Sequence, residues 1–80
     1  MMTQQEALQW ITMIFGAKPG SILPETKREH IPNWDSIGAI SLMAEIDEKH
    51  HILLDDRQLE TLKRIDDILQ LLRAHGKLAS

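Results

Sequence analysis

The fold is decided at Trp34-Asp35-Ser36-Ile37-Gly38, where a polar pair follows a proline-containing loop and opens the most apolar helical stretch of the chain. Aspartate and serine both cap helices well, so a helix is predicted to begin at Asp35 or Ser36 and to end near His50. Its apolar residues lie around much of its circumference, which is typical of a central helix packed on several sides.

The position of Ser36 favours a negatively charged substituent on its hydroxyl. The first N–H groups of a helix have no internal partners and the helix dipole is positive there, so a phosphodiester on Ser36 would suit this position. No histidine or lysine lies in a local arrangement that would serve as its base, so Ser36 is not predicted to be a self-activated nucleophile. The alternative interpretation is that Asp35 and Ser36 are simply an N-cap pair.

A first helix is predicted from Gln4 to Phe15. Thr3 and Glu6 have the spacing of a capping box, apolar residues recur every three to four positions, and Gly16 offers a C-terminal stop. Prolines at positions 19, 24 and 32 then interrupt any regular pattern, which indicates a long functional or packed loop. Three apolar side chains are expected to pin this loop to the core: Ile22, Leu23 and Ile31.

Two further helices are predicted after the central one. Asp55 or Asp56 can cap a short third helix that carries Leu59 and Leu62. A stripe with spacing i, i+3, i+4, i+7 predicts a fourth helix that ends near position 75, and its members are Ile65, Ile68, Leu69 and Leu72. Because no strand pattern is present, the fold class is predicted to be all-α.

Length and composition predict one domain over residues 1–80, in a chain without cysteine and therefore without a disulfide framework. The first residues have no basic region leading into an apolar stretch, and no segment approaches about 18 consecutive apolar residues. Neither a secretory signal nor an integral membrane segment is therefore predicted. A soluble cytoplasmic protein is expected.

Negative charge is concentrated after Ser36, although the net charge of the chain is only −3. This charge would repel nucleic acid and would steer basic patches of partner enzymes towards the region, so nucleic-acid binding is not predicted. An ordinary solvated face is the alternative interpretation. The acidic residues concerned are Glu45, Asp47, Glu48, Asp55, Asp56 and Glu60.

These features together resemble an acyl carrier protein. That family is marked by Asp-Ser-Leu opening a helix that ends in acidic residues and a short apolar step; the corresponding residues are Asp35-Ser36-Ile37 and the stretch from Asp47 to Ile52. The resemblance covers almost the whole chain and is closest between Trp34 and Leu72. It implies an acyl-carrier-protein-like four-helix bundle with a long loop between the first two helices and a short third helix.

The resemblance also implies a function. A phosphopantetheinyl transferase would attach the 4'-phosphopantetheine of coenzyme A to Ser36, with Asp35 as a recognition residue, and the terminal thiol of this arm would hold an acyl group as a thioester. The chain would be a monomer without catalytic residues. It would deliver its cargo, in fatty acid, lipid or secondary-metabolite biosynthesis, to ligases, synthases or acyltransferases that dock on the second helix.

Two sets of apolar side chains receive roles from the same resemblance, with core packing as the alternative for each. Three are expected near the attachment point of the arm, where they would contact the arm or an enzyme: Ile37, Ile40 and Met43. Six are candidates to line a space for the acyl chain: Leu8, Ile11, Leu42, Ile46, Leu62 and Ile68.

Three positions depart from the family pattern, and two of them, Gly38 and Ser41, bear on which pathway the carrier serves. Gly38 stands where a polar side chain is frequent, Ser41 where glutamate is common, and His50 where an aromatic residue is usual, so a core contact is expected to be weakened or replaced at His50. Trp34 is a feature of specialised freestanding carriers, or else an aromatic that packs the loop against the second helix. His50 and its neighbour His51 do not predict a metal site, because adjacent helical residues point in different directions.

Other functions remain open from the sequence. An aminoacyl or peptidyl carrier would be charged by an adenylating enzyme, and an unmodified helical interaction module would bind a partner through its acidic face. An enzyme is disfavoured, because the stretch around Ser36 lacks the first glycine of a Gly-x-Ser-x-Gly elbow and 80 residues cannot build the sheet which that elbow requires.

Overall fold

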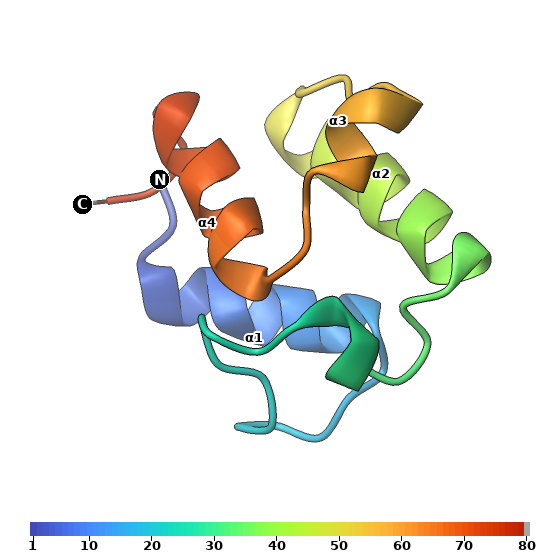
Figure 1. The fold of residues 1–80 in the computed structure, drawn as a ribbon. Helices are drawn as coiled ribbons and strands as arrows, with labels where there is room; N and C mark the ends of the chain where they lie inside the picture. The colour runs from blue at the N-terminus through green and yellow to red at the C-terminus, as the bar shows by residue number, and fades with distance from the viewer. Residues whose placement is uncertain (80) are drawn as a thin grey trace.

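The computed structural model describes residues 1–79 and contains four α-helices and one short 3-10 helix. The elements are α1 Gln4–Ile14, η1 Arg28–His30, α2 Ser36–His50, α3 Asp56–Glu60 and α4 Ile65–Ala74. No β-strand is present among these 79 residues, so the predicted all-α class is confirmed. In Figure 1, α1 runs beneath both α2 and α4. None of the described helices is both long enough and apolar enough to cross a membrane.

The ends of α1 and α4 follow the capping signals in the sequence. The Thr3 hydroxyl accepts from the Glu6 N–H at 3.1 Å, and the Glu6 carboxylate accepts from the Thr3 N–H at 2.9 Å, which is the predicted capping box. α1 ends one residue earlier than predicted, because Phe15 is its C-cap and Gly16 follows in the left-handed conformation (φ 62°). α4 is likewise followed by a left-handed Gly76 (φ 69°).

α3 is shorter than the sequence predicted. Of the two candidate caps, Asp55 is the N-cap, and its side chain accepts from the Gln58 N–H at 2.8 Å. The Thr61 hydroxyl donates to the Gln58 carbonyl at 2.6 Å and so satisfies an acceptor of the last turn. Leu62 was predicted on this helix, but it lies beyond Glu60 and is buried in the core.

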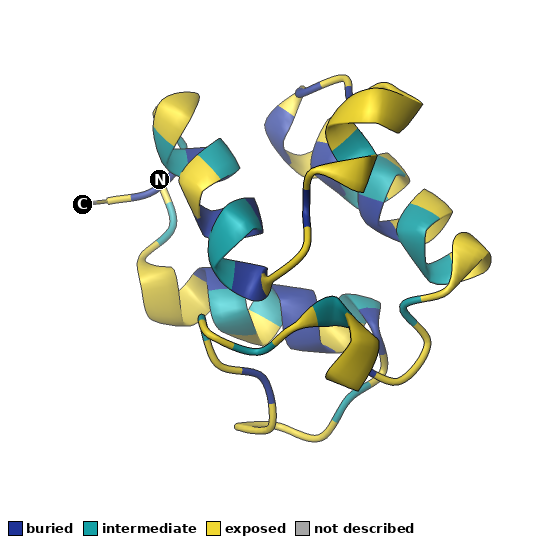
Figure 2. Cartoon of the chain, in the orientation of Figure 1, coloured by how far each residue is buried: buried dark blue, intermediate teal, exposed yellow. Residues whose placement is uncertain are grey.

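The core is a single cluster to which α1, α2, α4 and the segments between them contribute. Figure 2 shows that buried residues on these three helices are turned towards the middle of the molecule, while α3 is mostly exposed or half-buried. Eight of the core side chains have no exposed surface: Ala7, Ile11, Leu42, Ile46, Ile65, Ile68, Leu69 and Leu72.

The long connection between α1 and α2 is attached to the core at two of the three predicted positions. Ile22 and Ile31 are buried, whereas Leu23 is 49% exposed and its prediction as an anchor is wrong. Leu23 begins a turn in which its N–H donates to the Thr26 hydroxyl at 2.9 Å and its carbonyl accepts from the Thr26 N–H at 3.0 Å. The turn directs the Leu23 side chain away from the core that Ile22 already reaches.

Backbone hydrogen bonds join this connection to the start of α4. The N–H of Arg28 donates to the Lys63 carbonyl at 2.9 Å, and the N–H of Ile65 donates to the Thr26 carbonyl at 3.0 Å. They form an antiparallel bridge that places Lys27 opposite Arg64. Neither this bridge nor the adjoining η1 was predicted from the sequence.

Candidate functional site

Ser36 is the first helical residue of α2 and its side chain is exposed. It lines an open depression of about 250 Å³ between the start of α2, η1 and α3. Arg28 and Trp34 line this depression together with Leu59 and Glu60 of α3. An attached group of modest size would therefore begin in a surface hollow that contains one arginine.

Asp35 is the residue that caps α2. Its side chain accepts from the Gly38 N–H at 3.0 Å, so the carboxylate satisfies one of the free donors of the first turn. Of the two cap positions that the sequence left open, the structure selects Asp35. Asp35 therefore caps the helix without the Ser36 hydroxyl.

Gly38 is required by a close approach of the backbone. A Cβ atom at this position would overlap the carbonyl oxygen of Asn33. Asn33 itself adopts a left-handed conformation (φ 70°), and its side-chain amide donates to the Phe15 carbonyl at 3.0 Å. Glycine at position 38 thus has a structural cause, which is the packing of the loop against the first turn of α2.

The ring of Trp34 fixes the same loop. It stacks on Phe15 with ring centroids 4.9 Å apart and an angle of 18° between the planes. Trp34 is a packing aromatic, but it stacks on the C-cap residue of α1 and not on the central helix, against which it was predicted to pack the loop. Two contacts at Phe15, from Asn33 and Trp34, therefore hold the segment that leads into Ser36.

The apolar residues that follow Ser36 do not all belong to the core. Ile37 and Ile40 are 74% and 63% exposed, so core packing is wrong for both, while Met43 is half-buried against the core. Large exposed aliphatic side chains beside Ser36 form a surface that a partner or an attached group could cover. The six residues proposed to line an acyl space all lie in or against the hydrophobic core.

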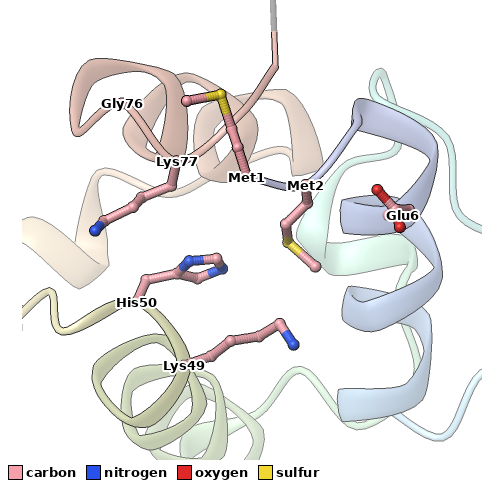
Figure 3. A pocket seen from close by; sticks show the side chains of 7 residues that line it. All are labelled: Met1, Met2, Glu6, Lys49, His50, Gly76 and Lys77. Carbon is pink, nitrogen blue, oxygen red and sulfur yellow. The ribbon is translucent and has the colours of Figure 1, made fainter.

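His50 is a buried polar residue at the end of α2. It is 6% exposed and meets Trp10 edge to face, with ring centroids 5.0 Å apart. Burial lowers the pKa of His50, and the charges of Lys49 and Lys77 lower it further. His50 and the two lysines border a hollow of about 600 Å³ (Figure 3). His50 therefore keeps an aromatic contact with the core through Trp10.

A metal site is not formed by the histidines. His50 is buried at the end of α2, while His51 is exposed in the left-handed C-cap position (φ 58°). Among residues 1–79, no group of three or more His, Cys, Asp or Glu side chains is placed to hold a metal ion.

The sequence did not reveal a second charged feature beside Ser36. Lys27 and Arg28 meet Lys63 and Arg64 at the antiparallel bridge, although the two pairs are more than thirty residues apart in the chain. Local charge sums hide this cluster, because each pair is flanked by acidic residues in the sequence.

Comparison of the chain with protein-family models, with curated proteins and with solved structures finds no match.

Proposed function

We propose that this protein is an acyl carrier that bears a 4'-phosphopantetheine arm on Ser36. The observation that carries the proposal is the exposed Ser36 at the first position of α2, in a surface depression. Asp35 caps the helix, so the Ser36 hydroxyl has no capping role. The order of two longer helices, one short helix and a further longer helix, with a long first connection, also supports it.

The residues around Ser36 fit such an arm. The N-terminal end of α2 favours the negative charge of a phosphodiester on Ser36. The depression leaves room for a transferase to reach the hydroxyl, and the loop held at Phe15 keeps the hydroxyl in place for it. When bound, the arm supplies the thiol for thioester formation. The chain itself offers no thiol, because it has no cysteine.

The exposed face of α2 is where we expect partner enzymes to dock. Ile37 and Ile40 provide apolar contacts next to the arm, and the exposed carboxylates of Asp47 and Glu48 provide negative charge further along the helix. Basic patches on a ligase, synthase or acyltransferase would be attracted to this charge. The chain contributes recognition and position, and the partner enzymes contribute the chemistry.

The direct test is intact-protein mass after incubation with coenzyme A, magnesium and a broad-specificity phosphopantetheinyl transferase. The native chain should gain the mass of one arm, and Ser36→Ala should gain nothing. Ser41→Ala is the matched control, because Ser41 is also exposed on α2, and it should still be loaded.

Failure of the native chain to be loaded by several transferases would contradict the proposal. The exposed pair Ile37 and Ile40 would then favour the second candidate, an unmodified module that binds a protein through α2. If loading occurs, charging of the arm by an adenylating enzyme with an amino acid, and not with an acyl group, would identify an aminoacyl or peptidyl carrier.

A further inference from the structure

A basic hollow lies next to the Ser36 depression. It has a volume of about 490 Å³ and is bordered by η1, the residue before it and the segment that leads into α4. Its walls carry four cationic side chains and two carboxylates, which leaves a surplus of two positive charges. The cations are Lys27, Arg28, Lys63 and Arg64, and the carboxylates are Glu29 and Asp67.

The backbone forces two of these cations together. Lys27 and Arg64 are directly opposite each other in the antiparallel bridge, and like charges at such positions destabilise the pairing. Asp67 offers limited relief, because its Oδ2 accepts from the backbone N–H groups of Lys63 and Arg64 at 2.9 and 3.0 Å. An anion in the basic hollow would offset this repulsion.

Arg28 connects the basic hollow to Ser36, since it borders both depressions. It is half-buried, and its Nη1 donates to the Leu62 carbonyl at 3.3 Å, so its guanidinium group is held at the boundary. Guanidinium has five N–H donors, and one bond to a carbonyl leaves others for a phosphate or carboxylate oxygen.

We propose that the basic hollow is an oxyanion-binding site for the group carried on Ser36. The oxyanion is either the phosphodiester at the root of the arm or a carboxylate on the cargo, and both would reach the cations by way of Arg28. The proposal rests on the proposed function, because it requires a group on Ser36. If the cargo carboxylate is the ligand, the basic hollow gives this carrier a preference for negatively charged over neutral acyl groups.

The test compares four forms of the 15N-labelled protein by NMR: unmodified, loaded with the bare arm, and loaded with arms bearing a butyryl or a succinyl group. These acyl groups have the same number of carbons, and only succinyl ends in a carboxylate. We expect the amide signals of Lys27, Arg28, Lys63 and Arg64 to shift on loading, and the shift to shrink as salt is added.

The comparison identifies which oxyanion binds. A shift already present with the bare arm assigns the phosphodiester, and a shift that appears only with succinyl assigns the cargo carboxylate. The same measurements on Arg28→Gln should lose the shift at residues 63 and 64, while Lys18→Gln, an exposed cation in the first loop, should retain it. If the lost bond to Leu62 prevents Arg28→Gln from folding, Lys63→Gln replaces it.

Two results would overturn the inference, and mass spectrometry separates them. A loaded Ser36 without any shift at the four cations, or with an unchanged shift in Arg28→Gln and Lys63→Gln, overturns the oxyanion site alone. A Ser36 that cannot be loaded overturns the proposed function together with it.

Discussion

At the scale of single residues, Gly38 shows how the loop before α2 limits its first turn. The Asn33 carbonyl occupies the space of a side chain at this position. We expect Gly38→Ala to lower the free energy of unfolding by roughly 1–3 kcal/mol, because either the loop or the helix must shift to admit the methyl group. Urea denaturation measures this, with Ser41→Ala as an exposed control on the same helix that should change little. An unchanged midpoint for Gly38→Ala would contradict this expected loss.

Asp35 has two assigned roles, and a pair of substitutions separates them. Asp35→Ala removes the cap on the Gly38 N–H and should cost about 0.5–2 kcal/mol of unfolding free energy, whereas Asp35→Asn keeps a capping oxygen and should cost little. If a transferase recognises the carboxylate, both variants should be loaded more slowly at Ser36, as followed by intact mass. Normal loading of Asp35→Asn would limit Asp35 to its role as a cap.

Residue-scale predictions from the sequence were reliable where the signal is local. The Thr3–Glu6 capping box and the Asp35-Ser36 helix start depend on neighbouring residues only, and both lie where predicted. The need for glycine at position 38 could not be predicted in this way, because it arises only when the left-handed Asn33 is packed against the helix. The error at Leu23 has a different cause, because the direction of its side chain is set by a local turn closed at Thr26, which the apolar pattern does not indicate.

At the scale of elements, α2 has an exposed face and a buried one, and they should respond differently to substitution. Ile40→Ser should change the unfolding free energy by no more than about 0.5 kcal/mol, because the side chain is largely in water. Ile46→Ala should cost about 2–5 kcal/mol, because Ile46 has no exposed surface. Chemical denaturation of both variants provides the comparison. Similar losses would mean that Ile40 is packed in solution and would remove it from the docking surface.

The elements could be predicted to within a few residues, but their contacts could not. Apolar spacing and capping signals predicted all four α-helices, but the spacing favoured core packing for Ile37 and Ile40, because a helix packed on several sides has no clear polar face. The bridge of Lys27 with Arg64 carries no sequence signal at all. It depends on how the long connection folds back, which is a property of tertiary packing.

At the scale of the whole molecule, His50 makes stability depend on pH. Its pKa lies below the ordinary value of about 6.5, so the folded protein holds His50 neutral where the unfolded chain begins to protonate it. This contribution is fully present above pH 6.5 and is lost as the pH falls from there towards the lower pKa of the folded state. We expect urea midpoints of the native chain to decrease over this window.

His50→Phe provides the comparison for this prediction. Phenylalanine keeps an aromatic ring against Trp10 and removes the titrating group, so the decrease in the urea midpoint between pH 7 and lower values should be smaller than in the native chain. An equal decrease in both proteins would assign the pH dependence to other groups.

The aromatic contacts at the two ends of α2 give the protein two built-in optical probes. The chain has two tryptophans and no tyrosine, so its intrinsic fluorescence comes from Trp10 and Trp34. Trp34 stacks at the loop that leads into Ser36, and Trp10 contacts the last residue of α2. Emission from a Trp10→Phe variant would thus report on events at Ser36, and emission from Trp34→Phe would report on the state of His50.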